Sequence, residues 1–328
     1  MPFNTKLTRA LGIKGKFHVH VFTYTRNANL NSQSPLYKVA CNGAHPAYSR
    51  RPAKRNPKMQ DHDPKALRRE YHSPSSHDPP DYGAYAQVAI DEGIKIVETA
   101  GNSPGPIIKQ LKAVGIIILH KCTTIKHAQS AVKLGVDFLS IDGFECAGHV
   151  GETDITNLIL LSRARQSIGI PFIASGGFAD GQGLAAALSL GAEGINMGTR
   201  FMCTIEAPIH QNIKQSIVDA QETDTELVLR RWRNTSRLFK NKVASEAVKI
   251  EQASTTGKFE EVAPYVSGKR GREVFINGDP EFGVWTAGQV IGLIHDIPSC
   301  ADLIGRIERD AEQTLNSASS LIVPSSKL

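Results

Sequence analysis

Short apolar segments alternate with amphipathic segments along the chain from Asp81 onward. The amphipathic segments carry apolar residues at helical spacing, and two of them are followed by a glycine, Gly135 and Gly191. Repeated strand–helix units predict a parallel sheet with right-handed crossovers. The expected strands are 94–99, 115–120, 137–142, 171–175 and 194–197, and the expected helices are 106–114, 124–134, 153–168 and 180–190.

A doubly wound sheet and a closed barrel both fit this alternation. Glycines, polar residues and a histidine follow the strand ends directly, which is where barrel enzymes place their active sites. We therefore predict an α/β protein with a (β/α)8 TIM barrel, of which the last five strands are readable, and a small, mostly helical inserted domain. The expected divisions are 1–80, an aberrant segment in place of the first three strands; 81–205, the barrel core; 206–278, the insertion; 279–316, helices that complete the barrel; and 317–328, a flexible tail. Residues 208–238 and 285–314 are expected to be helical.

The composition is that of a globular protein, with 41% hydrophobic and 21% charged residues. The formal charge of +6 raises nucleic acid as a partner. However, much of the excess lies between Arg50 and Arg69 and lacks interleaved aromatic residues, so we expect no nucleic-acid role. No apolar run reaches the length of a membrane span. Five cysteines form no CxxC pair and no spacing supports a zinc site, so we expect reduced thiols and no metal.

The last three residues are Ser326, Lys327 and Leu328. This Ser-Lys-Leu motif is a peroxisomal address that an import receptor reads as a free tail. We therefore expect a peroxisomal protein, the alternative being a chance polar tail on a cytoplasmic one. The first residues lack the apolar region of a secretory signal.

Two glycine-containing loops follow the last two expected strands. The first begins at Ser175-Gly176-Gly177 and opens a helix, and the second is Met197-Gly198-Thr199. Glycines at a strand end let backbone N–H groups approach a phosphate closely, and the start of a helix adds positive potential. Barrels characteristically bind phosphate with the loops after their last two strands. These six residues are therefore a candidate phosphate site, the alternative being two tight turns without a ligand.

A histidine lies in the loop after the third expected strand, within Asp-Gly-Phe-Glu-Cys-Ala-Gly-His-Val-Gly-Glu from Asp142 to Glu152. The flanking glycines allow His149 to reach over a flat ligand. Neutral imidazole is a ready base near neutral pH, since its unperturbed pKa is about 6.5. Alone, His149 would be interpreted as a solvent-exposed loop residue. Beside two candidate phosphate loops, it is a candidate catalytic base.

These loops together resemble the nitronate monooxygenase (2-nitropropane dioxygenase) family. The shared blocks are Ala-Gly-His-x-Gly-Glu, Ser-Gly-Gly-Phe-Ala-Asp-Gly and Met-Gly-Thr-Arg-Phe, and the resemblance extends from about Asp81 to Thr314. The resemblance implies an FMN-dependent barrel enzyme in which His149 lies beside the flavin and takes the substrate's α-proton. It also implies that Ala147 and Gly148 lie against the cofactor, that the substrate is a nitroalkane or nitronate, and that O2 completes the reaction.

Lys121 ends the second expected strand and would point to the barrel mouth. A cation there can stabilise the negative charge of a reduced flavin or pair with phosphate. The resemblance supports contact between Lys121 and the cofactor, and a surface salt bridge is the alternative. Cys122 and Cys146 lie near the same mouth and are expected to be small, partly buried side chains without a nucleophilic role.

The resemblance stops between about residues 15 and 79. Family members carry three strands there, the third with Pro-Phe-Gly-Val-Asn, whereas this stretch is rich in histidine and proline. If Lys54 to Pro79 is back-translated with chosen codons and read one base later, it can encode a peptide that contains Pro-Phe-Gly-Val-Asn. We therefore hypothesise that at least this stretch is translated out of frame. Sequencing the transcript tests this, and an unbroken frame in an active enzyme would refute it.

The sequence thus predicts FMN-dependent oxidation of nitronates or nitroalkanes to a carbonyl compound and nitrite. One alternative is an FMN-dependent reductase that uses NAD(P)H to reduce a quinone or an enoyl thioester. An alternative of another class is an inactive remnant, because the first three strands are missing from the pattern. Retention of flavin separates the remnant from both enzymes.

Overall fold

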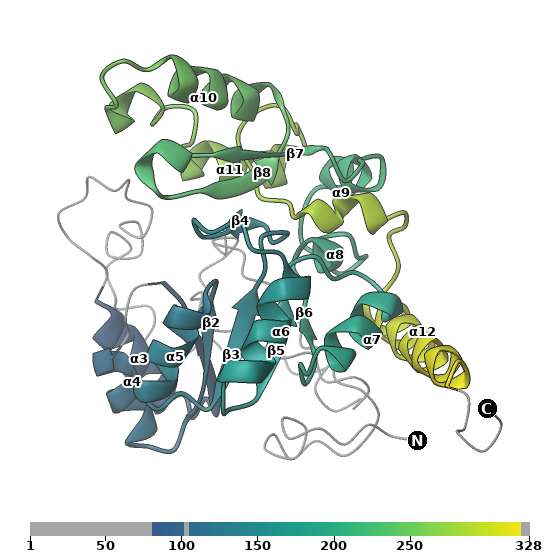
Figure 1. Ribbon diagram of the computed structural model, residues 1–328. Helices are drawn as coiled ribbons and strands as arrows, with labels where there is room; N and C mark the ends of the chain where they lie inside the picture. The colour runs from purple at the N-terminus through teal and green to yellow at the C-terminus, as the bar shows by residue number, and fades with distance from the viewer. Residues whose placement is uncertain (1–80, 102–104, 323–328) are drawn as a thin grey trace.

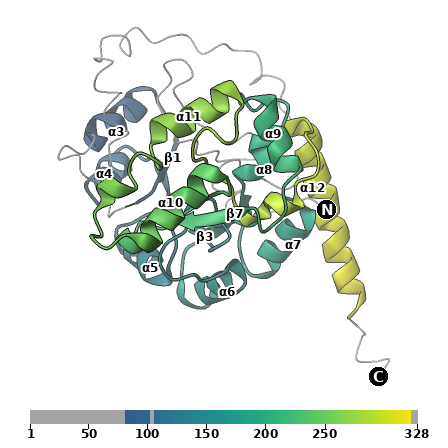
Figure 2. The same ribbon diagram turned by 90° about the horizontal axis from the view of Figure 1, so that it is seen from above.

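The computed structural model of the protein describes residues 81–101 and 105–322. Its centre is a curled, five-stranded parallel sheet with the order β1-β2-β3-β5-β6, which forms a half-barrel. Helices α3 to α7 follow one another in an arc on its outer side (Figures 1 and 2). The strands are β1 (Ile96–Thr99), β2 (Ile117–Cys122), β3 (Phe138–Asp142), β5 (Phe172–Ser175) and β6 (Ile195–Asn196). The helices are α3 (Tyr82–Asp91), α4 (Gly105–Lys112), α5 (Ile125–Lys133), α6 (Asn157–Ser167) and α7 (Gly181–Ser189).

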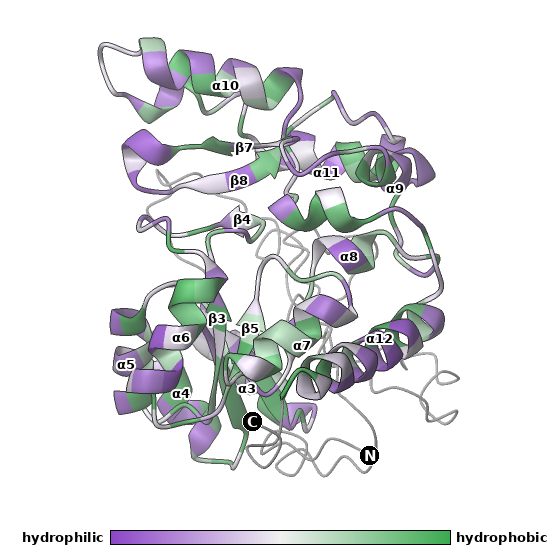
Figure 3. Ribbon diagram, turned by 45° about the vertical axis from the view of Figure 1, so that its right-hand side comes forward, coloured by the Kyte–Doolittle hydropathy of each residue, from purple (hydrophilic) through white to green (hydrophobic). Residues whose placement is uncertain are grey.

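The five strands and the helices between them match the predicted alternation. Strand side chains alternate between two apolar faces, as a sheet covered on both sides requires. On the outer face, Ile118 and Leu139 pack with helix residues in the main core. On the inner face, Leu119, Phe138 and Ile173 form a separate small cluster. Figure 3 shows hydrophilic positions along the outer surfaces of α5 and α12 (Cys300–Ser320).

The helix ends follow local signals in the sequence. The Thr124 hydroxyl accepts a hydrogen bond from the His127 backbone N–H at the start of α5, and the Asp180 carboxylate does the same for Gly183 at α7. Gly135 and Gly191 follow the last turns with φ of 89° and 95°, a conformation that glycine adopts without strain.

A second, smaller sheet lies over the carboxyl ends of the parallel strands (Figure 1). It is antiparallel, with the order β4-β8-β7, where β4 is Gly148–His149, β7 is Thr225–Val228 and β8 is Ser236–Phe239. Helices α10 (Lys242–Ala253) and α11 (Gly268–Asn277) belong to the same upper layer.

This sheet corrects the expectation that residues 208–238 are helical. Only the first part is helical, as α9 (Gln211–Val218), and the rest forms the β7–β8 hairpin. The hairpin turn contains Leu229 and Arg233 with φ of 64° and 51°. Glycine or asparagine usually occupies such positions, so Leu229 and Arg233 provide no turn signal.

The C-terminal region is less continuously helical than predicted. Between Trp285 and Thr314, the regular elements are the 3-10 helix η5 (Gln289–Leu293) and α12, with an extended segment between them. Helix α12 extends to Ser320, past the boundary expected at 316, and packs against α7. Among the described helices, none has both the length and the apolar character needed to cross a membrane. The 1–80 segment with its frame hypothesis and the Ser326–Leu328 tail lie outside the described residues.

Candidate active site

Polar side chains occupy the inner face of the half-barrel at the carboxyl ends of its strands. Lys121 on β2 and Asp142 on β3 form an ion pair, with 2.6 Å between Nζ and Oδ2. The Asp142 side chain is 1% exposed, whereas that of Lys121 is 30% exposed at the mouth. Glu98 is opposite Leu119 in the β1–β2 register, so it shares the inner face with Lys121. The sheet therefore places two carboxyl groups around one ammonium group.

Burial changes the acidity of these groups. It raises the pKa of the Glu98 carboxyl to about 7, with Lys121 opposing and Asp142 adding to the rise. Burial alone would lower the pKa of Lys121, but the Asp142 carboxylate outweighs it with help from Cys146 and Glu98, and the pKa of Lys121 is raised. Lys121 therefore stays a cation at any physiological pH. Lys121 thus forms a salt bridge, as the alternative interpretation expected, but its partner is buried; contact between Lys121 and a cofactor stays a prediction.

The loop after β5 has the backbone geometry of an anion cradle. Gly176 and Gly177 have φ of 80° and 84°. The Asn157 side-chain amide donates to the Ser175 carbonyl at 2.9 Å and to the Gly176 carbonyl at 2.5 Å. In a trans peptide the next N–H points opposite to the carbonyl. The N–H groups of Gly176 and Gly177 therefore point away from Asn157 and α6.

The loop after β6 lies next to this cradle. Ser175 is opposite Asn196 in the register of the two strands. Met197 is buried, and the space where a Cβ of Gly198 would stand is open, with no atom within 4 Å. Thr199 begins the short helix α8 (Thr199–Met202).

The histidine loop connects β3 to α6, lies against the first glycine loop and is linked to the second through Gly288. A Cβ on Gly176 would stand 2.5 Å from the Cys146 Cβ, so the two backbones are in direct contact. The Thr199 hydroxyl accepts a hydrogen bond from the Gly288 backbone N–H at 3.0 Å, and Gly288 in turn lies against Ala147. Gly148 has a φ of 70°, and His149 after it is exposed.

The structure therefore places the predicted cofactor-site residues and His149 at one end of the sheet. Lys121, Ala147, Gly148 and His149 lie at the same end of the sheet as the two glycine loops. A phosphorylated, flat cofactor fits this arrangement, because backbone N–H groups, an open space at Gly198, the partly exposed ammonium group of Lys121 and the exposed His149 all lie at this end of the sheet.

The cysteines near the site are not nucleophiles. Burial raises the pKa of the Cys122 and Cys146 thiols to about 12 in each case, so both are protonated at neutral pH. This agrees with the expectation that they are small packing residues. Within residues 81–101 and 105–322, no three potential metal ligands gather at one place.

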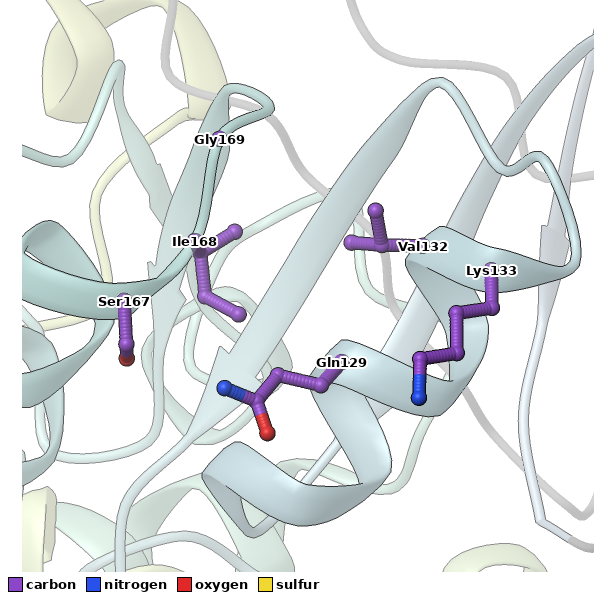
Figure 4. Close-up of a pocket in the computed structure, with 6 residues that line it drawn as sticks. All are labelled: Gln129, Val132, Lys133, Ser167, Ile168 and Gly169. Carbon is purple, nitrogen blue, oxygen red and sulfur yellow. The ribbon is translucent and has the colours of Figure 1, made fainter.

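The hollow shown in Figure 4 lies at the other end of the sheet. Val132 and Lys133 precede β3, and Ile168 and Gly169 precede β5, so the hollow adjoins the amino ends of these strands. Barrel enzymes work at the carboxyl ends. We assign the hollow no role in the chemistry.

The fold and the site define the class of the protein: it is an FMN-dependent α/β-barrel oxidoreductase. The chain belongs to the nitronate monooxygenase family, because the model of the family described as "Nitronate monooxygenase" matches residues 52–310. The match begins upstream of Asp81, so residues 52–79 lie within it, although we expected them to fall outside the resemblance.

Relatives in this family have more than one activity in their names. The chain is 30% identical over 284 residues to the (3aS,4S,5R,7aS)-5-hydroxy-7a-methyl-1-oxo-octahydro-1H-indene-4-carboxyl-CoA dehydrogenase of Mycobacterium tuberculosis, covering 75% of this chain and 79% of that protein. It is 27% identical to the nitronate monooxygenase of Neurospora crassa, over 66% of this chain and 61% of that protein.

Solved structures agree with the fold. FabK from Thermotoga maritima has a TM-score of 0.68 at 30% identity and is matched over 72% of this chain and 74% of that chain. The nitroalkane oxidase of Streptomyces ansochromogenes has a TM-score of 0.61 at 21% identity, over 75% and 72% of the two chains, and therefore shows the fold alone.

Sequence reasoning missed three residues of the site. Asp142 is the last residue of β3, and Lys121 is the last but one of β2, so the strand-end rule that singled out Lys121 could have found Asp142 too. Gly288 lies in a Trp-Thr-Ala-Gly-Gln block that the family resemblance includes, but nothing in the sequence assigned it a role. Asn157 carried no signal, because it acts through a contact with a loop that is distant in sequence.

Proposed function

We propose that this protein oxidises nitronates or nitroalkanes with O2, using FMN, and releases a carbonyl compound and nitrite. The observation that supports the proposal is the position of the histidine loop at one end of the sheet, where it contacts the first glycine loop directly and is linked to the second through Gly288. An exposed histidine in this loop is available to act on a substrate at the same end of the sheet. The nitronate monooxygenase named among the relatives supports the choice of substrate.

Each group in the site has a part in this reaction. The N–H groups of Gly176, Gly177, Gly198 and Thr199 would hold the phosphate, with Ser175 and Met197 shaping the loops. Lys121 would stabilise negative charge near the cofactor ring. FMN, when bound, supplies the redox chemistry by taking electrons from the substrate and passing them to O2.

His149 would act on the substrate before the redox step. A neutral imidazole takes the α-proton of a nitroalkane, and the C–H electron pair becomes part of the nitronate. A nitronate supplied as such has already lost this proton. His149 is therefore needed in full only for the neutral substrate.

The test is a comparison of the wild type with His149→Ala. We expect the purified wild type to contain FMN and to release nitrite from both substrate forms. His149→Ala should keep its flavin but lose about 100-fold or more in kcat/KM for the neutral nitroalkane. Absence of flavin from the wild type would favour an inactive remnant, and an unchanged rate in the variant would reject His149 as the base.

A second candidate is an FMN-dependent reductase that takes hydride from NAD(P)H and reduces a quinone or a thioester-linked enoyl group. The observation in its favour is that the relative at 30% identity is named a dehydrogenase of a carboxyl-CoA, which is a thioester. Bleaching of the flavin by NADH in the absence of O2, with no nitrite from nitronate, would establish this candidate instead.

The C-terminal Ser326-Lys327-Leu328 motif leads us to propose peroxisomal import through its receptor. Import is tested with a fluorescent protein fused at the N-terminus of the chain. We expect punctate peroxisomal fluorescence that becomes diffuse when these three residues are removed. Diffuse fluorescence of the intact fusion would reject the proposal.

A further inference from the structure

The loop that carries His149 is paired with the β7–β8 hairpin, which comes from a distant part of the chain. Gly148 and His149 of β4 are opposite Arg237 and Ser236 of β8. Directly after this bridge, the Val150 backbone N–H donates to the Thr235 carbonyl at 3.3 Å. The backbone of the candidate base is thus part of a small sheet whose other two strands belong to the hairpin.

A carboxylate holds this pairing at its C-terminal end. Both oxygens of Glu152 bind the same residue: Oε1 accepts from the Thr235 backbone N–H at 2.9 Å, and Oε2 accepts from the Thr235 hydroxyl at 2.6 Å. Thr235 is 1% exposed. Hydrogen bonds to an ionised group are stronger than neutral ones, and two of them fix direction as well as distance. Glu152 is three residues after His149. Thr235 directly precedes Ser236, which is paired with His149 in β8.

An arginine holds the other end of the loop. The Arg237 guanidinium donates to the Phe144 carbonyl at 2.9 Å and to the Thr225 hydroxyl of β7 at 3.1 Å. It also lies over the Phe144 ring, 4.7 Å from the centroid. Arg237 is 3% exposed. The loop is therefore tied to β8 before and after His149.

We propose that β8 is the template that positions the catalytic base, and that Glu152 and Thr235 form the clamp on which this positioning depends. The clamp residues are positioning residues, because they act through the backbone of the β4 segment and not on the substrate. This inference rests on the proposed function only where it concerns proton abstraction. The mechanical part, that the clamp holds the His149 backbone, stands on the contacts themselves.

The first test is hydrogen exchange of the full-length FMN-loaded protein. The Val150 amide reports on the strand pairing without contacting Glu152. In Glu152→Ala and Thr235→Val, we expect Val150 to exchange about tenfold faster or more, because its bond to the Thr235 carbonyl opens. The Ala174 amide, which donates to the Gly194 carbonyl in the main sheet, should be unchanged.

Two variants serve as controls for this exchange test. Thr235→Ser keeps both donors and should restore the wild-type exchange at Val150. Asp154→Asn removes the exposed ion pair with Arg230, which joins the same two segments at 2.9 Å, and should have little effect because exposed pairs contribute little. Unchanged Val150 exchange in Glu152→Ala, or an equal rise at Ala174, would overturn the clamp.

The second test separates positioning of the base from a general structural role. A displaced base slows proton abstraction, and a misplacement of about 1 Å can cost up to 100-fold. We therefore expect Glu152→Ala to lower kcat for a neutral nitroalkane about tenfold, with unchanged KM, flavin content and rate on preformed nitronate. Equal losses on both substrate forms would overturn positioning. If the wild type oxidises neither form, the proposed function fails, while the exchange result still decides whether the clamp exists.

Discussion

Gly198 allows a test of the phosphate cradle at the scale of one residue. A methyl group there would meet no protein atom within 4 Å, and the residue does not have a positive φ. Gly198→Ala should therefore fold as stably as the wild type. If the open space holds the cofactor phosphate, the variant should bind FMN at least about tenfold more weakly, since a methyl group would obstruct the approach to the backbone.

The measurement for Gly198→Ala is a flavin fluorescence titration together with urea unfolding of the flavin-free protein. Gly93→Ala is the contrasting control, because its φ of 68° makes alanine strained while no atom lies nearby. That control should lose stability and keep its FMN affinity. Wild-type affinity in Gly198→Ala would exclude the phosphate from this loop.

Glu98 makes stability depend on pH. Its pKa is about 7 in the fold against a usual value of 4.5, so the folded protein favours the protonated carboxyl. The stabilisation is complete below pH 4.5 and is lost as the pH rises through about 7. Glu98→Gln stays neutral at both pH values. Its free energy of unfolding, relative to that of the wild type, should therefore rise by on the order of 2 kcal/mol from pH 5 to pH 8, allowing for partial exposure of the side chain.

Urea unfolding of both FMN-loaded proteins at the two pH values measures this gain. A pH-independent difference for Glu98→Gln would show that Glu98 is already ionised at pH 5.

At the scale of elements, the packing of α12 on α7 depends on Gly181, because glycine has no side chain. A Cβ on Gly181, the first residue of α7, would stand 2.5 Å from the Ala311 backbone nitrogen in α12. The helices could accommodate it only by moving apart. Gly181→Ala should therefore lower the free energy of unfolding by about 1–3 kcal/mol, although alanine favours helix formation.

Gly105→Ala is the matched control, since Gly105 is the first residue of α4 and its Cβ would make an ordinary 3.6 Å contact with Leu134. That variant should be as stable as the wild type or more stable. Thermal unfolding of the two variants measures the contrast. Equal effects of both substitutions would mean that α7 and α12 do not approach as closely as described.

The elements also show how far the sequence could predict the fold. The five strands were predicted to within two residues at each end, because buried β-branched runs and glycines such as Gly135 and Gly191 mark their limits. The β7–β8 hairpin was missed because its turn uses Leu229 and Arg233 in a conformation that glycine usually adopts. No local signal distinguishes this turn from a charged helix.

At the scale of the whole molecule, strand ends predicted which candidate residues would share one end of the sheet. Parallel strands bring their carboxyl ends to one edge, so Lys121, His149 and the glycine loops had to lie close together once the barrel was predicted. The supports of the site could not be predicted in this way. The Asn157 amide and the Glu152 clamp join residues whose proximity depends on the finished fold.

The most direct test of the central claim is a crystal structure of the protein with FMN. We predict the phosphate at the backbone N–H groups of Gly176, Gly177 and Gly198, and the flavin ring beside His149. FMN bound at another place, or with its ring remote from His149, would contradict the account.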